Sequence, residues 1–356
     1  MKSIIRFAAL LALALTALFP ATSLAVNAQA AQCYGLADAD CKLLQDAGSA
    51  DSTAKLSSFN IDYSIKATIA GTGAADGNLN ITGSGPFAID PAVMADLKAN
   101  AGKAMDPATT VKAISALSFA NVIKLESTIP TVTPGTFEVR IVGGNLYFMG
   151  DKATQGKWMT LNLAQQMSAM GSSMGGMMGG ASASTNPAAN PKIQADIEAL
   201  MKAPGVVKTE SGDGPSVDGQ ATRKLTWNID FAALFAAPEF KTLVTDISAA
   251  SGQSMETAQL DQTIQMGQVI LKDTKFQVSY LVGSGDKLFH GFGMTLAVKL
   301  DPQYAALLTN NTDAKELNVN FDLNVQLSKI GQPVKVDPVA DAQNVNPGGM
   351  APTPAK

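Results

Sequence analysis

Apolar and polar residues alternate with a period of two over long parts of the chain. The clearest segments run from Phe59 to Ile69 and from Leu317 to Leu327, with apolar residues at the odd positions and almost only polar ones between them. Successive side chains of a strand point to opposite faces, so this pattern predicts strands with one buried and one wet face, typical of antiparallel sheets. Weaker alternation predicts further strands over 79–89, 122–129, 136–142, 145–149, 221–229, 275–282 and 288–300.

Glycine pairs mark two hairpin turns between these strands. Gly143-Gly144 separates 136–142 from 145–149, and Gly283-Ser284-Gly285 separates 275–282 from 288–300. Glycine adopts the positive φ angles that tight hairpins require, so both pairs of segments are predicted to be neighbours in the sheet.

Apolar residues spaced by three and four predict fewer helices, which lie between the strands. These helices are expected over 91–103, 163–178, 192–202, 239–249 and 256–271. Four predicted strands end in an aspartate or asparagine that begins a helical turn, because such side chains cap the free amides of a helix. These capping residues are Asp90, Asn162, Asp230 and Asp301. Strands that lead directly into helices predict one α+β unit with helices laid across one sheet face.

The first thirty residues have the pattern of a secretory signal peptide. Lys2 and Arg6 precede a thirteen-residue apolar run from Phe7 to Phe19, and Asn27–Ala30 offers the small residues that signal peptidase needs. A membrane-spanning helix needs about 20 apolar residues. We therefore expect cleavage near Ala30, an exported protein that is secreted or held in the cell envelope or periplasm, and no transmembrane span.

Composition narrows the possible partners. Removal of residues 1–30 takes away Lys2 and Arg6 and no acidic residue, so the net charge changes from −4 to −6. Binding to nucleic acid needs a concentrated basic surface, so nucleic acid is not an expected partner. Hydrophobic residues make up 46% of the chain and charged residues 16%. Such a balance suits either a large sheet or an apolar cavity.

The only two cysteines, Cys33 and Cys41, are predicted to form a disulfide, as an even pair in an oxidising compartment usually does. The bond would close a short loop and contribute about 2 kcal/mol. Lipidation of Cys33 is the alternative, but Ala30 and Gln32 do not fit a bacterial lipobox. We expect a disulfide-closed helical segment over 31–54, one domain over 55–330, and a proline-rich, largely disordered tail over 331–356.

Candidate catalytic chemistry is scarce. The single histidine, His290, falls by alternation among apolar residues and is interpreted as a core residue with a hydrogen-bond partner. General acid–base catalysis needs a second positioned group, and no nucleophile elbow, phosphate loop, zinc spacing or calcium loop is present. We expect no enzyme activity, no metal and no cofactor.

Methionines form a stripe along the predicted helix 163–178. Met167, Met170, Met174 and Met177 follow steps of three and four, so they share one helix face. The stripe is interpreted as a packing face, as a flexible surface for variable apolar partners, or as a Cu(I) site. Several glycines in 171–180 weaken this helix, at about 1 kcal/mol each relative to alanine, so it suits a lid over the sheet.

Three segments resemble a known family. Phe137–Phe148 reads Phe-Glu-Val-Arg-Ile-Val-Gly-Gly-Asn-Leu-Tyr-Phe, and Lys157–Leu163 reads Lys-Trp-Met-Thr-Leu-Asn-Leu. With Val217–Asp230, these segments and their order resemble the LppX/LprAFG lipoproteins within the LolA/LolB-like superfamily, over about 55–330. The resemblance implies a curved antiparallel half-barrel with helices on its concave face around an apolar cavity. It also implies a carrier of acyl chains or lipidated proteins, although the lipobox that tethers many relatives is missing here.

The expected function is therefore binding or transport of a lipid or other apolar ligand without catalysis. The cavity is predicted between the apolar sheet face and the helices in 163–178 and 239–271. Its expected lining residues are Ile65, Ile69, Leu225, Phe292, Met294, Phe321, Met170 and Met174. The alternatives are a cell-envelope structural or interaction protein with a closed core and a methionine-rich copper-binding protein. The sequence leaves ligand identity and oligomeric state open.

Overall fold

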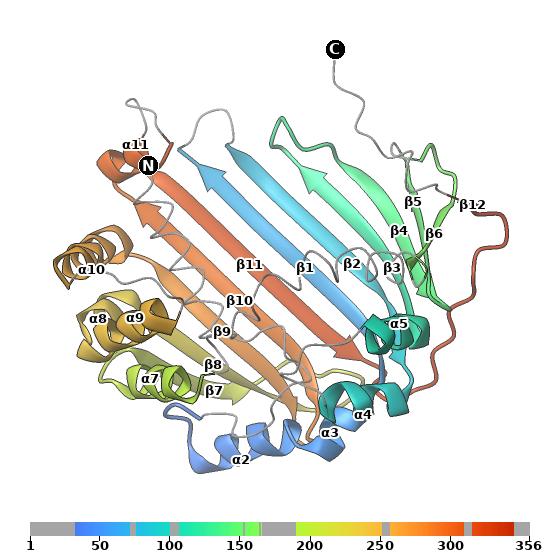
Figure 1. Ribbon diagram of the computed structural model, residues 1–356, viewed down its shortest axis with the longest axis horizontal. Coiled ribbons are helices and arrows are strands. Elements are labelled where there is room, and N and C mark those ends of the chain that lie inside the picture. Colours follow the sequence, from blue (N-terminus) through green and yellow to red (C-terminus); the bar gives the residue numbers. More distant parts are fainter. Residues whose placement is uncertain are drawn as a thin grey trace.

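The computed structural model shows an α+β protein built on one open sheet of twelve strands (Figure 1). It describes residues 33–71, 76–99, 107–151, 154–163, 165, 190–250, 257–309 and 315–344. The strand order is β12-β6-β5-β4-β3-β2-β1-β11-β10-β9-β8-β7, and every pairing is antiparallel except that of β12 with β6. The strands are β1 (Ser58–Ala70), β2 (Gly77–Ile89), β3 (Leu117–Ser127), β4 (Gly135–Val142), β5 (Asn145–Gly150), β6 (Met159–Asn162), β7 (Val207–Asp213), β8 (Thr222–Asp230), β9 (Lys275–Gly283), β10 (Phe289–Leu300), β11 (Leu317–Ser328) and β12 (Gln343–Asn344).

The strands with the strictest alternation, β1 and β11, pair with each other in the middle of the sheet, from Asn60 opposite Ser328 to Ala70 opposite Asn318. Both predicted hairpins are confirmed. Gly143 and Gly144 connect β4 to β5, both with positive φ, and the turn after Gly283 connects β9 to β10. Two strands, β7 and β12, were not predicted, and β6 was predicted only as a strand that ends at Asn162.

One face of the sheet is apolar across its width. Residues directly opposite one another in neighbouring strands share a face. One such row crosses β8, β9, β10, β11, β1, β2 and β3 as Trp227, Val278, Met294, Leu323, Ile65, Ile81 and Leu125. We call the face that carries this row the inner face. The opposite, outer face carries polar residues such as Lys66, Asp322 and Thr295, which are also opposite one another.

The helices lie beside and across the ends of this sheet (Figure 1). The prediction over 192–202 corresponds to α7, 239–249 to α9, 256–271 to α10 and 91–103 to α4, whose continuation beyond Ala99 lies outside the described residues. The prediction over 163–178 lies outside them almost entirely, and α5 was not predicted. The helices are α2 (Asp38–Ala47), α3 (Ala50–Lys55), α4 (Pro91–Ala99), α5 (Pro107–Ala116), α7 (Pro191–Lys202), α8 (Phe231–Ala236), α9 (Pro238–Ala250), α10 (Thr257–Leu271) and α11 (Pro302–Thr309).

Three of the four predicted helix caps are formed by side chains. Asp90 accepts from the backbone N–H of Ala92 at 2.8 Å, Asn162 from Gln165 at 2.7 Å and Asp230 from Ala233 at 3.1 Å. At Asp301 the backbone carbonyl accepts from Tyr304 and Ala305. Because each cap satisfies amides that would otherwise lack a partner, the chain turns from strand to helix without a linker.

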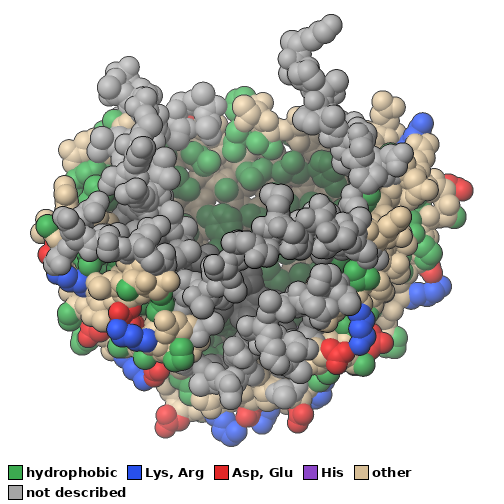
Figure 2. Space-filling model, in the orientation of Figure 1, with side chains coloured by type: hydrophobic (Ala, Val, Ile, Leu, Met, Phe, Trp, Pro, Cys, Tyr) green, Lys and Arg blue, Asp and Glu red, His purple; other side chains and the backbone are tan. Residues whose placement is uncertain are grey.

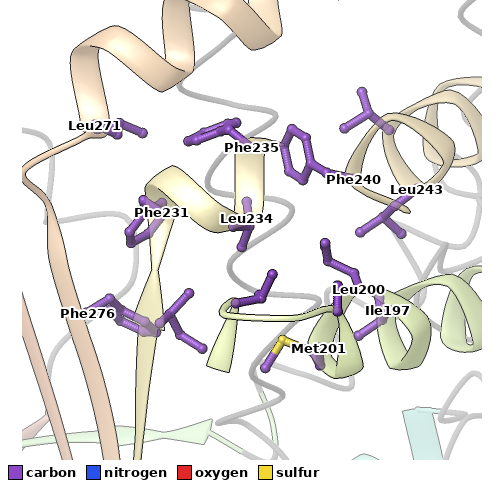
Figure 3. Packing of buried hydrophobic residues seen from close by; sticks show 14 of the residues in the cluster. Ile197, Leu200, Met201, Phe231, Leu234, Phe235, Phe240, Leu243, Leu271 and Phe276 are labelled. Atoms are coloured by element: carbon purple, nitrogen blue, oxygen red, sulfur yellow. The ribbon is translucent and has the colours of Figure 1, made fainter. Parts of the chain in front are cut away.

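Helices α7 to α10 form the largest hydrophobic core with β8 and β9 (Figure 3). Leu200 of α7, Leu234 of α8 and Leu243 of α9 are at most 2% exposed. The rings of Phe235 and Phe240 meet edge to face at 4.8 Å. These helices cover Ile229, Phe276 and Val278, which all lie on the inner face.

The structure confirms the predicted disulfide Cys33–Cys41, which closes a short loop within the N-terminal described segment. Leu44 and Ala47 of α2 pack against the inner-face residues Leu225, Trp227 and Val282. Ion pairs fix the same helix, since Arg223 contacts Asp40 at 3.0 Å and Lys287 contacts Asp46 at 2.8 Å. The hydrogen bond from Arg223 holds the pKa of Asp40 below its usual value.

The start of the proline-rich tail belongs to the fold. Residues 331–344 are described, and Gln343–Asn344 form β12 in parallel with Met159 and Thr160 of β6. The expectation of a largely disordered tail from 331 onward therefore does not hold for this part. Residues beyond 344 lie outside the described chain, as does the predicted signal peptide.

Candidate ligand-binding face

The inner face divides into a filled half and an open half. In the filled half, over β8 and β9, the helices bury most inner-face residues, and the inner-face residues of β10 from Phe292 to Val298 are partly exposed and form its border. No buried side chain of β1 to β6 belongs to a hydrophobic cluster among the described residues. We call the partly exposed inner-face side chains of these strands and of β11 the open half. It comprises Tyr63 and the apolar residues Phe59, Ile61, Ile65, Ala67, Ile69, Leu79, Ile81, Phe87, Leu117, Phe119, Ile123, Leu125, Phe137, Val139, Ile141, Leu146, Phe148, Met159, Leu161, Val319, Phe321, Leu323 and Val325.

The open half forms a hollow rather than a flat surface. Figure 2 shows hydrophobic side chains on the floor of this hollow, over the middle strands of the sheet. Apolar side chains of the open half lie opposite one another on neighbouring strands, as Phe321 of β11, Ala67 of β1 and Leu79 of β2 do. Such a concave apolar surface is the usual lining of a binding site for an apolar molecule.

The residues predicted to line the cavity fall into three groups. Ile65 and Phe321 lie in the open half, and Ile69 lies at its edge, where it packs against the buried cluster of Leu300, Ala305 and Leu317. Phe292 and Met294 lie at its border, because they are partly exposed and also pack against the filled core. All five share the inner face, as the alternation indicated.

Leu225 shares that face but is 0% exposed, because α2 and Trp227 cover it. It belongs to the core and is not available to a ligand. The predicted cavity wall at 239–271 likewise corresponds to α9 and α10, whose buried side chains complete the filled half. The lid residues Met170 and Met174 lie outside the described residues.

Polar side chains are few on the open half. The Tyr63 hydroxyl donates a hydrogen bond to Oδ1 of Asn121 at 3.1 Å. Asn121 is 2% exposed, and its Nδ2 has no acceptor among the described residues. Burial raises the pKa of the Tyr63 hydroxyl, so Tyr63 is a neutral hydrogen-bond donor at neutral pH.

Sequence reasoning missed Asn121 because the predicted strand began at residue 122, whereas β3 begins at Leu117. An apolar register of Leu117, Phe119, Ile123 and Leu125 surrounds Asn121 in the sequence. A polar amide among these apolar positions is the sequence signal that could have identified Asn121. A buried polar group costs free energy unless it is hydrogen-bonded, so an amide at such a position points to a specific role.

His290 is 2% exposed and has hydrogen-bond partners, as predicted. Its Nε2 lies 2.8 Å from Oδ2 of Asp286, and its Nδ1 lies 3.4 Å from the carbonyl oxygen of Leu327. The strand is irregular between Phe289 and Gly291, so simple alternation does not apply there. These contacts join the β9–β10 turn to β11 and give His290 a structural role.

Within the described residues, no group of three or more histidine, cysteine, aspartate or glutamate side chains is arranged to hold a metal ion. The methionine stripe considered for copper lies outside those residues.

A separate groove of about 340 Å³ lies on the outer face of β2 to β4. The tail residues Lys335 and Asp337 form one wall, and Glu138 and Arg140 line the sheet side. Arg140 also lies over the ring of Trp158, at 4.8 Å. This groove combines charged residues with apolar ones such as Val122, whereas the open half carries no charged side chain among the described residues.

Comparisons with known proteins leave the family undetermined: no protein-family model matches this chain, and no curated protein is significantly similar to it. In the part of the chain that the structure describes, no helix has the length and apolar character needed to span a membrane.

Proposed function

We propose that this protein is an exported, non-enzymatic carrier or binding protein for a lipid or other apolar ligand, held on the open half. The observation that carries the proposal is the contrast between the two halves of one apolar face. Residues such as Leu225 and Val278 are at most 1% exposed under helices, whereas Ile65 and Phe321 remain partly exposed. A protein leaves a contiguous apolar surface incompletely covered chiefly where it binds something.

The energetics favour a long-chain ligand. Each buried methylene group contributes about 0.8 kcal/mol. An alkyl chain of about 16 carbons therefore offers enough free energy to offset the loss of its translational and conformational freedom on binding. No charged side chain of β1–β6 or β11 shares the inner face among the described residues, which suits a ligand recognised mainly by its apolar part.

The resemblance to the LppX/LprAFG and LolA/LolB-like proteins supports this proposal. An open antiparallel sheet with helices over one face agrees with the half-barrel that this resemblance implies. In this interpretation the concave side of the half-barrel is the inner face, and the cargo is an acyl chain, either free or attached to a protein.

Export fits the chemistry of the N-terminal segment. The Cys33–Cys41 disulfide is of a kind that persists in oxidising compartments. We place the protein outside the cytoplasm, secreted or in the cell envelope or periplasm, after cleavage near Ala30, and without a lipid anchor.

Native mass spectrometry of the protein purified from its own host tests the proposal. We expect adducts with the masses of lipids. Absence of any adduct supports a closed-core structural or interaction protein instead, and adducts with the mass of copper support a copper-binding protein.

A matched pair of variants locates the site. Phe321→Asp places a charge on the open half and is expected to abolish uptake of an alkyl ligand. Asn320→Asp changes the adjacent, exposed residue on the outer face and is expected to leave uptake unchanged. Equal uptake by both variants, each shown to be folded by circular dichroism, contradicts the assignment.

A further inference from the structure

Asn121 is a buried residue of β3 that lies on the inner face between residues of the open half. Its Cα partner on β4 is Val139, and its neighbours on the same face of β3 are Phe119 and Ile123. Among the described residues of β1–β6 and β11, Asn121 carries the only side-chain amide on the inner face. An amide at this place costs free energy that a leucine would not, so its presence needs an explanation.

The hydrogen bonding of Asn121 is half complete. Tyr63 satisfies Oδ1, and Nδ2 is buried without an acceptor in the described protein. A buried donor without a partner loses its hydration and gains nothing in return. Asn121 therefore contributes little to the stability of the fold, and its Nδ2 is suited to donate a hydrogen bond to an acceptor on a ligand.

Gly83 explains how the two side chains meet. A Cβ at Gly83 would lie 2.3 Å from Cζ of Tyr63 and 2.6 Å from Oδ1 of Asn121. The Tyr63 ring therefore lies against the backbone of Gly83, with its hydroxyl at Oδ1 of Asn121. Tyr63 itself is only partly buried.

The charge of the acceptor follows from its surroundings. A carboxylate transferred to an apolar surface is costly unless a cation pairs with it. Among the described residues, the inner face of β1–β6 and β11 carries no lysine or arginine. One neutral amide donor matches the carbonyl oxygen of an ester or an amide better than a free carboxylate.

We propose that Asn121 anchors the carbonyl group of a neutral ester or amide lipid, with Tyr63 as the movable cover of this anchor. This inference rests on the proposed function, which it makes more specific. It distinguishes acylated, neutral ligands from free fatty acids and from plain hydrocarbons.

Three probes with similar alkyl chains test the inference: methyl palmitate, palmitate and hexadecane. Their dissociation constants are measured by displacement of a fluorescent alkyl probe from the full chain at neutral pH. For the wild-type protein we expect methyl palmitate to bind about tenfold more tightly than hexadecane, which is the effect of one hydrogen bond to an otherwise unpaired donor. Palmitate is expected to bind more weakly than methyl palmitate.

The variant Asn121→Leu is expected to lose this preference for the ester while its affinity for hexadecane stays the same. Asn121→Ala serves as a second variant should Asn121→Leu not fold, and Asn320→Leu, on the outer face, is expected to keep the preference. Equal binding of ester and hydrocarbon by the wild type, or an ester preference that survives in Asn121→Leu, overturns the inference while leaving the proposed function intact. Failure of all three probes to bind the wild type overturns the proposed function itself.

Discussion

Two buried polar residues of this protein have different roles: one stabilises the fold, and the other is a candidate contact for a ligand. Asp40 belongs to the first kind: its carboxylate receives two hydrogen bonds from Arg223, at 3.0 and 3.2 Å, and so fixes α2 to β8. We assign Asn121 to the second kind, because its Nδ2 lacks an acceptor in the described protein and Tyr63, the cover that we propose for it, is only partly buried. The two residues therefore respond differently to substitution.

Replacement of Asp40 by asparagine is expected to lower the free energy of unfolding at pH 7 by about 1 to 2 kcal/mol, as for other charge-assisted hydrogen bonds. Because Arg223 lowers the pKa of Asp40 in the folded state, this contribution is complete above the unfolded pKa of about 4. It is lost as the pH falls through the lower, folded pKa. Urea unfolding of both proteins between pH 7 and pH 2 measures the difference, and a difference that grows at acidic pH contradicts this account.

Replacement of Asn121 by leucine is expected to leave the free energy of unfolding of the ligand-free protein unchanged or slightly higher, because it removes a buried donor without a partner. Urea denaturation of the delipidated protein measures this. A loss of more than about 2 kcal/mol, within the range for a broken buried network, assigns Asn121 a structural role instead.

The helices that pack against the inner face determine which of its residues are buried in the core. Alternation places Leu225 and Leu323 on the same face, but α2 covers the first and leaves the second partly exposed. The period-two pattern specifies the face of a side chain and carries no information about which helix lies over it. For this reason the sequence predicted the face of Leu225 correctly and its availability incorrectly.

A pair of alanine substitutions tests this distinction. Leu225→Ala, at a site that is 0% exposed, is expected to lower the free energy of unfolding by about 2 to 5 kcal/mol. Leu323→Ala, in the open half, is expected to cost less than about 1.5 kcal/mol because its side chain is only partly removed from water. Thermal and urea unfolding of the delipidated proteins provide both values, and equal losses contradict the division of the face.

The methionine stripe in 163–178 remains a prediction at the scale of the element, since it lies outside the described residues. If this helix serves as a lid, replacing Met170 and Met174 by aspartate abolishes lipid uptake and leaves the sheet folded. Uptake measured with a fluorescent lipid, together with circular dichroism, tests the lid, and uptake at the wild-type level excludes it.

For the whole molecule, the sequence predicted the architecture better than the site. Strict alternation in Phe59–Ile69 and Leu317–Leu327 is enough to predict two antiparallel strands, and β1 and β11 proved to be central neighbours. The edge strand β7 was missed because Val207 is its only large apolar residue, so no alternation is visible there. The two-residue β12 is too short to leave any periodic pattern.

The division into halves could not be predicted, because it depends on contacts between elements far apart in the chain. Helix α2, near the N-terminus of the described chain, covers strands β8 and β9, whereas β1 and β2 are left partly exposed. An apolar face with a partly exposed half is the central claim of this account, and the ligand is assigned to that half.

Photocrosslinking with a neutral lipid ester that carries a diazirine in its alkyl chain tests this claim most directly. After irradiation, peptide mapping by mass spectrometry identifies the residues in contact with the chain. The account predicts crosslinks to the inner-face residues of β1–β4 and β11, such as Ile65, Leu125 and Phe321. Crosslinks confined to the outer face or to the buried faces of α7–α10, or no specific crosslinks at all, contradict it.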